Sequence, residues 1–174
     1  MDNVRPGSGL SDSPVADDVG ILYAEDLRAG DVFELGTTSA TEDEIIEFAK
    51  RFDPLPIHVD REAAAAGPFG GIIGSAAHSL ALYSSLASRV FIPRLALVAG
   101  KGIETMRLPN PLRPDVIHTA GIEILEVAPR FRGEDRTTER ADLRCAGRLV
   151  DDEGRVVLAM APLQVIRYRM LQQR

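Results

Sequence analysis

One segment of the sequence restricts the possible folds more than any other. Residues 75–90, SAAHSLALYSSLASRV, carry apolar or small side chains on nearly every face of a helix. A helix without a polar face is usually buried, because no side of it gains from contact with water. We therefore expect this segment to form a central helix that the rest of the chain covers.

The sequence after this helix is rich in residues that favour strands. Five segments contain many Val, Ile, Leu and Thr residues: 95–99, 102–108, 115–127, 139–150 and 155–169. Asp152-Glu153-Gly154 is typical of a hairpin turn, and the polar residues 128–138 predict an exposed loop. Strands in succession predict an antiparallel sheet, so the fold class is α+β, with the sheet wrapped around the buried helix.

The chain before the central helix predicts one strand and two shorter helices. Residues 31–38 mix apolar and polar residues and suit a strand. Thr41-Glu42-Asp43-Glu44 has the pattern of a capping box, and apolar residues follow at helical spacing to Phe52. The two prolines that follow end this helix, and Asp60 can cap a second, short one.

Composition argues against several classes of partner. The 174 residues have a net charge of −6, whereas a nucleic-acid surface is rich in Lys and Arg. No apolar run reaches the roughly 20 residues that span a bilayer. Residues 1–20 lack the apolar core of a secretory signal and predict a disordered leader. The single Cys cannot form an intrachain disulfide. We expect a cytoplasmic protein with one domain over 21–174 and no nucleic-acid or membrane partner.

The segment Phe52-Asp53-Pro54-Leu55-Pro56-Ile57-His58 joins a carboxylate to an imidazole through a stiff chain. Its two prolines restrict the backbone between Asp53 and His58. A carboxylate and an imidazole held together can bind one water, remove its proton and return a proton elsewhere. An Asp before a proline is also a common start of a turn. The segment alone leaves both interpretations open.

Other residues of reactive types favour structural interpretations. His78 lies in the apolar helix and His118 in a strand, where a lone His is usually a core residue. The three His lack the spacing of metal ligands, so we expect no metal. The loop Gly70–Gly74 lacks the Lys of a phosphate-binding loop and indicates close backbone packing. Cys145 has no evident partner and is interpreted as an inert thiol.

Over a longer stretch, FAKRFDPLPIHVDREAAAAGPFGGIIGSAAHSLAL resembles the hydratase motif of the MaoC-like dehydratases, a family that includes (R)-specific enoyl-CoA hydratases. The family pattern D-x-x-P-x-H falls on Asp53, Pro56 and His58. A second Asp, an Ala-rich short helix, a Phe-Gly-Gly loop and a buried helix follow in register. The resemblance is strong over 21–82 and weaker to Tyr168.

The resemblance implies a hot-dog fold and the addition or removal of water across the double bond of a trans-2-enoyl thioester, on coenzyme A or a carrier protein. It implies that Asp53 and His58 form the acid–base pair and that the backbone N–H of Ala76 binds the thioester oxygen. Three more positions complete the implied thioester site: Gly71, Ser75 and Ser84. No cofactor is implied besides the coenzyme A of the substrate, and the setting is fatty acid metabolism. Because a lone sheet leaves an edge and a face uncovered, we expect a homodimer or a higher oligomer.

Three positions depart from the family pattern. Leu55 replaces a common Asn, Ala76 replaces a common Gly, and Arg113-Pro114-Asp115 lacks the glycine of a Pro-Gly-Asp turn. Two alternatives therefore stay open: a non-catalytic hot-dog subunit or ligand-binding partner, and an acyl thioesterase. A thioesterase usually carries a carboxylate on the buried helix, and residues 75–88 contain no Asp or Glu.

Overall fold

The computed structural model describes residues 20–132 and 137–169, so the predicted leader lies outside the described residues except for its last position. No helix in these ranges is long and apolar enough to cross a membrane. The elements in chain order are η1 (Ala24–Asp26), β1 (Val32–Thr38), α1 (Glu42–Phe52), α2 (Pro56–Val59), α3 (Arg61–Ala66), α4 (Ala76–Val90), η2 (Ile92–Arg94), β2 (Leu97–Arg107), β3 (His118–Arg132), β4 (Thr137–Asp151) and β5 (Val156–Arg167).

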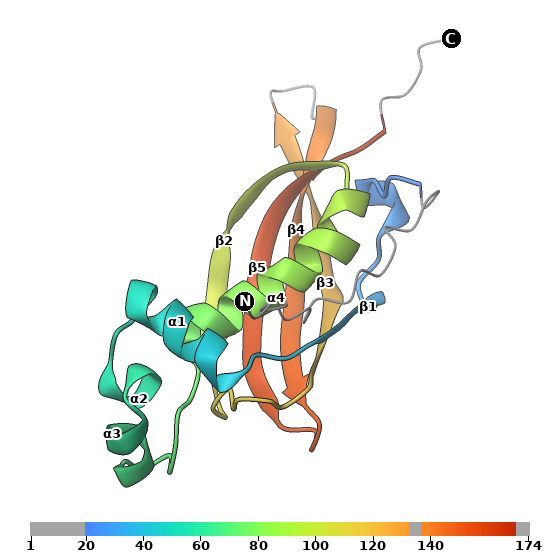
Figure 1. Ribbon diagram of the computed structural model, residues 1–174. Coiled ribbons are helices and arrows are strands. Elements are labelled where there is room, and N and C mark those ends of the chain that lie inside the picture. Colours follow the sequence, from blue (N-terminus) through green and yellow to red (C-terminus); the bar gives the residue numbers. More distant parts are fainter. Residues whose placement is uncertain (1–19, 133–136, 170–174) are drawn as a thin grey trace, which may run out of the picture.

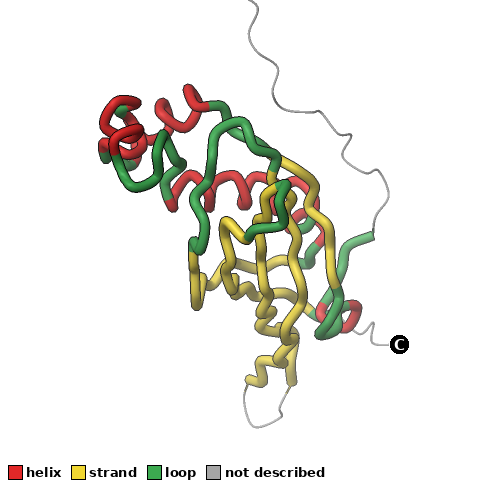
Figure 2. Tube along the Cα trace, turned by 90° about the horizontal axis from the view of Figure 1, so that it is seen from below, coloured by secondary structure: helices red, strands yellow, loops and turns green. Residues whose placement is uncertain are grey.

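The five strands form one antiparallel sheet in the order β1-β3-β4-β5-β2. The long helix α4 lies across one face of the sheet, and α1, α2 and α3 project beyond the strands as a separate cluster (Figure 1). A view turned by 90° shows the same arrangement, with α4 along one side of the strands (Figure 2). This architecture confirms the predicted α+β hot-dog fold.

The helix α4 is buried on the side that faces the sheet. Tyr83 and Ala87 pack there against the inner residues of β3 and β4, such as Ile122 and Leu143. Burying each large apolar side chain stabilises the fold by about 1.5–3 kcal/mol. The opposite side of α4 is exposed and carries mostly small residues, with two larger ones at its end: Ala76, Ala77, Ala81, Ser84, Ser85, Ser88, Arg89 and Val90. We predicted a helix that is covered on all sides. In the single chain, only the side of α4 that faces the sheet is covered.

The sequence-based strand boundaries need two corrections. Most of the segments 95–99 and 102–108 belongs to a single strand, β2, whose pairing with β5 shifts at three places along its length. The strands β3 and β4 continue through most of 128–138, where a loop was predicted. Polar residues are compatible with this part of the hairpin, since Arg130 and Arg140 face each other across the strands and are both exposed. The predicted turn at Asp152-Glu153-Gly154 is confirmed.

Helix caps in the first half form as predicted. The Glu44 N–H donates to Thr41 Oγ1 over 3.2 Å, and the Thr41 N–H donates to Glu44 Oε2 over 2.7 Å, which completes the capping box. Asp60 accepts the N–H groups of Glu62 and Ala63 at the start of α3. The short helix α2 was not predicted. Proline fits the first position of a helix, so Pro56 begins α2.

Asp115 takes the left-handed conformation that the family's glycine would suit. Its φ is 61°, and its N–H donates to the Ala40 carbonyl over 2.9 Å. Asp and Asn tolerate this region better than other side chains that have a Cβ. The absence of glycine from Arg113-Pro114-Asp115 therefore does not remove the turn.

Close contact between α4 and the sheet depends on Gly147 in β4. A Cβ atom built on Gly147 would overlap the hydroxyl oxygen of Tyr83 and lie 2.6 Å from its Cζ. We expect Gly147→Ala to lower the free energy of unfolding by about 1–3 kcal/mol in urea denaturation, because the ring cannot retreat inside a packed core. Gly121→Ala in β3 is the control, since the nearest atom to its new methyl group is the Phe33 carbonyl oxygen at 3.7 Å, an ordinary contact distance. Equal stability of the two variants would contradict this account.

Stability should also depend on pH through His118. This residue is 0% exposed, and neither ring nitrogen has a hydrogen-bond partner of good geometry among the described residues. Burial lowers the pKa of His118, although the Val116 backbone and the carboxylates of Asp151 and Asp152 oppose that shift.

The unfolded chain therefore binds a proton at this ring near pH 6.5, where the folded chain does not. Full stability is present above that pH and is lost as the pH falls toward the lower folded-state value. We expect the free energy of unfolding, measured in urea, to decrease between about pH 7.5 and pH 5.5. His118→Leu should remove part of this decrease, and an unchanged slope would show that His118 is not its source.

Candidate active site

The segment after α1 is a hydrogen-bonded turn that brings Asp53 and His58 together. The Asp53 N–H donates to the Ala49 carbonyl over 2.8 Å and thereby ends α1. The Leu55 N–H then donates to the Asp53 carbonyl over 2.8 Å, and the His58 N–H to the Leu55 carbonyl over 2.9 Å. These bonds leave Asp53 Oδ2 3.8 Å from His58 Nε2.

The ring of His58 is fixed by a hydrogen bond to the loop before α4. Its Nδ1 lies 2.7 Å from the carbonyl oxygen of Ile73. A carbonyl can only accept, so Nδ1 carries the proton and donates. In the neutral ring, Nε2 is then left with a lone pair on the side of Asp53. The local hydrogen bonding thus prepares His58 to accept a proton at Nε2.

The gap between the two side chains suits a shared water. A separation of 3.8 Å is too long for a direct hydrogen bond, but one water can lie about 2.8 Å from both atoms. The His58 side chain is only 7% exposed, whereas the Asp53 side chain is 34% exposed. The pair is therefore open to solvent from the carboxylate side. Leu55 is 52% exposed, so its side chain lies largely in solvent.

The glycine-rich loop approaches the rest of the chain closely, as predicted. The Gly74 N–H donates to the Leu112 carbonyl over 2.8 Å, and a methyl group on Gly74 would overlap the Leu112 side chain. Gly70 has a φ of 68°, which favours glycine. This contact holds the loop from which the Ile73 carbonyl reaches His58.

The remaining four predicted site residues lie in the loop before α4 and in α4 itself. Ser75 caps α4, since its Oγ accepts the His78 N–H over 3.2 Å. Ala76 is the first residue of α4, so its N–H has no partner within the helix. Gly71 is half-buried in the loop before α4. Ser84 is exposed two turns along α4, and the structure gives no hydrogen bond between it and either member of the pair.

Two contacts at the site were not predicted from the sequence. One is the hydrogen bond from His58 to the Ile73 carbonyl, which any residue type at position 73 could supply. The other is a stack between His78 and the Phe48 ring, with centroids 4.3 Å apart. The sequence does not reveal these contacts, because the first depends on how α2 lies against the loop before α4 and the second on how α1 packs against α4.

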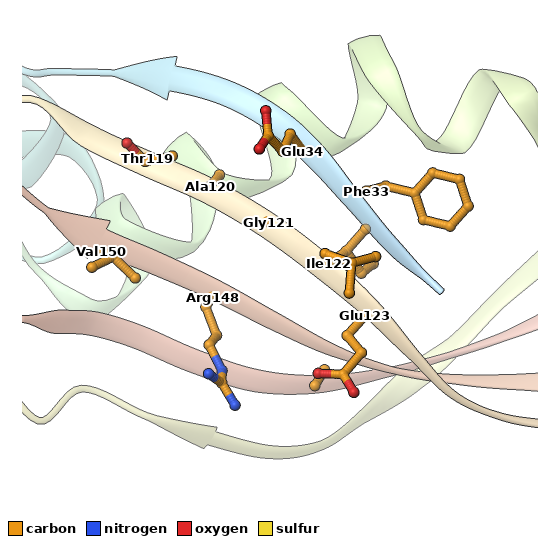
Figure 3. Close-up of a pocket in the computed structure, with 11 residues that line it drawn as sticks. Phe33, Glu34, Thr119, Ala120, Gly121, Ile122, Glu123, Arg148 and Val150 are labelled. Carbon is orange, nitrogen blue, oxygen red and sulfur yellow. The ribbon is translucent and has the colours of Figure 1, made fainter. Parts of the chain in front are cut away.

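A separate hollow of about 260 Å³ lies on the other face of the sheet, away from α4 (Figure 3). Its rim includes Glu34 of β1, Glu123 of β3 and Arg148 of β4, and Gly121 lies between them. It contains none of the predicted site residues. Within the described ranges, no three His, Cys, Asp or Glu side chains gather as the ligands of a metal ion would.

A family model, a curated relative and a solved structure match most of the chain. Residues 28–142 match the model of the MaoC-like domain. The uncharacterized protein YdeM of Bacillus subtilis (strain 168) is 31% identical over 109 residues, which are 63% of this chain and 77% of YdeM. The MaoC-like dehydratase from Rhodospirillum rubrum is 32% identical with a TM-score of 0.76, over 86% of this chain and 99% of that one.

The fold extends to a more distant enzyme. The R-hydratase PhaJ1 from Pseudomonas aeruginosa superposes with a TM-score of 0.64 at 22% identity, over 87% of this chain and 94% of that one. This likeness concerns the fold. The match over residues 28–142 covers more than half of the sequence, and by that match the chain belongs to the MaoC-like domain family.

Proposed function

We propose that this protein adds water to, or removes it from, the double bond of a trans-2-enoyl thioester, with Asp53 and His58 as its acid–base pair. The observation that carries the proposal is the 3.8 Å separation of Asp53 Oδ2 and His58 Nε2, with the ring held by the Ile73 carbonyl. Membership of the MaoC-like family supports the same reaction class, since solved relatives include a dehydratase and an R-hydratase.

In the hydration direction, a water lies between the two side chains. As its oxygen forms a bond to C3, Asp53 and His58 together take its proton. The electron pair of the double bond moves toward C2 and the thioester carbonyl. A proton returned from the pair to C2 completes the addition, so the pair ends in its starting state. Dehydration follows the same steps in reverse.

Negative charge develops on the thioester oxygen during this step. The N–H of Ala76, at the positive end of the 15-residue helix α4, is the donor we assign to that oxygen. A preorganised donor of this kind contributes about 3 kcal/mol to lowering the barrier. Gly71, Ser75 and Ser84 remain assigned to the surroundings of the thioester. The substrate would be carried on coenzyme A or a carrier protein, and the reaction needs no other cofactor.

The two alternatives predict different chemistry at the same site. A thioesterase would attack the carbonyl, and α4 offers no carboxylate for that step. A non-catalytic subunit would explain Leu55, which supplies no amide beside the pair. The fixed His58 ring opposes this second alternative, because a binding subunit does not require Nε2 to face the Asp53 carboxylate.

We also propose that two copies pair through β2 to form a homodimer. Every residue of this edge strand after Leu97 is exposed, including the apolar Val98, Ile103 and Met106. An exposed edge that is long and apolar is a template for pairing with another strand. The opposite edge, β1, is shorter and interrupted by a bulge near Gly36. Pairing along β2 would cover the more exposed of the two edges.

Replacing the carboxylate tests the acid–base assignment. We expect Asp53→Asn to lower kcat for hydration of enoyl-CoA substrates by at least about 100-fold, because the amide cannot accept the proton. His58→Gln should have a similar effect. A spectrophotometric assay with a panel of acyl lengths measures both, and circular dichroism checks folding. Asp43→Asn is the control, since Asp43 is an exposed residue paired with Arg61. Full activity in Asp53→Asn would rule out the proposed mechanism.

Charge placed on the edge strand tests the dimer. Light scattering should give the mass of two 18.9-kDa chains for the unmodified protein and of one chain for Ile103→Lys/Met106→Lys, since lysine on an edge strand opposes pairing. Ile117→Lys replaces an exposed isoleucine outside β2 and should leave the mass unchanged. A double variant that remains dimeric would place the interface elsewhere.

A further inference from the structure

The contact between α1 and α4 contains a row of rings that the proposed reaction does not use. The imidazole of His78, in the first turn of α4, lies face to face with the ring of Phe48 in α1. Their centroids are 4.3 Å apart and their planes differ by 7°. Phe48 also contacts Phe52, with ring centroids 4.8 Å apart. The row therefore runs from the start of α4 to the residue before Asp53.

Both ends of this row are tied to parts of the proposed site. At one end, Ser75 Oγ accepts the His78 N–H, two residues after Ala76. At the other end, the Asp53 N–H is bonded to the Ala49 carbonyl, so Asp53 follows the last turn of α1. A shift of α1 along α4 would therefore move the Asp53 carboxylate relative to the α4 N-terminus.

His58 does not share this dependence. Its ring is held by the Ile73 carbonyl in the loop that leads into α4. The carboxylate thus follows the last turn of α1, whereas the imidazole, on α2, is bonded to the loop before α4, and α4 itself supplies the proposed oxyanion donor. Besides the short turn at 53–58, two side-chain contacts join these groups. One is an apolar cluster of Ile45 and Ile46 with Ile72 of the loop before α4, against which Leu82 of α4 packs. The other is the ring stack, which involves the first turn of α4 itself.

Stacking accounts for the ring at position 78 better than its nitrogen atoms do. His78 is buried, and its Nδ1 has no hydrogen-bond partner among the described residues. An unpaired buried nitrogen destabilises the fold. Burial lowers the pKa of His78, against the attraction of Glu44 on α1, so the ring is neutral near pH 7. A flat neutral ring is what Phe48 contacts, and phenylalanine could replace it.

We propose that His78 is a positioning residue: its stack on Phe48 fixes α1 against the first turn of α4 and thereby sets the place of Asp53 relative to His58 and Ala76. This inference rests on the proposed function. It assigns His78 no contact with substrate.

Truncating either ring tests the proposal. We expect His78→Ala and Phe48→Ala each to lower kcat about 10- to 100-fold with little change in KM, because a displacement of about 1 Å at a reacting group is enough for such a loss. The double variant should lose little more than either single variant, since both remove the same contact. His78→Phe keeps the stack and should retain kcat within about threefold, with a higher Tm.

Phe33→Ala is the matched control. Its ring pairs with Phe91 elsewhere in the core, with centroids 4.9 Å apart, so its loss should lower Tm and leave kcat unchanged. Two results would overturn the proposal. Unchanged kcat in His78→Ala would reduce the stack to ordinary packing. Activity in His78→Phe as low as in His78→Ala would mean that the imidazole itself takes part.

A measurement without turnover separates this inference from the proposed function. NMR signals of the His58 ring nitrogens report on the nearby carboxylate. They should shift in His78→Ala and Phe48→Ala, and stay in place in His78→Phe and Phe33→Ala. If the unmodified protein hydrates no enoyl thioester, the proposed function fails while this pattern still decides the positioning role. Unshifted signals in both alanine ring variants would reject it.

Discussion

The close approach of α4 to its surroundings is the constraint on which the rest of the structure depends. Tyr83 reaches the backbone of β4 because Gly147 has no side chain, and the loop before α4 reaches Leu112 because Gly74 has none. These two contacts fix the middle of the helix and the chain that leads into it. The first N–H groups of α4 and the Ile73 carbonyl are thereby held in place, and His58 takes its orientation from that carbonyl.

Much of the fold could be predicted because its signals are local. The capping box at Thr41–Glu44, the cap at Asp60 and the turn at Asp152–Gly154 each depend on side chains that bond within a few residues. The apolar helix and the strand-like segments that follow it in succession predict the α+β class from the order of segments along the chain. The two prolines correctly mark the end of α1. The fixed φ of Pro56 also starts the short helix α2, which was not predicted.

The rest depends on contacts between distant parts of the chain. Strand ends in the β3–β4 hairpin follow cross-strand pairing, so the polar residues there gave no sign that the strands continue. That one side of α4 is exposed could not be predicted from its sequence, because it follows from the sheet covering only the other side of the helix. At the site, the pattern of Asp53 and His58 was visible in the sequence. The Ile73 carbonyl and the Phe48–His78 stack were not, since a backbone oxygen and a packing contact leave no motif.

Asp53, His58 and the Ala76 N–H all come from one continuous stretch of chain, from the end of α1 to the first turn of α4, while the strands before and after it supply the frame. Such a division has a consequence for how proteins of this architecture can diversify. After gene duplication, one copy could accumulate changes between α1 and α4 and lose its reactivity. It could still keep the sheet and continue to assemble with the other copy. The catalytic and architectural roles could then be inherited separately, by unequal partners that descend from a single ancestor.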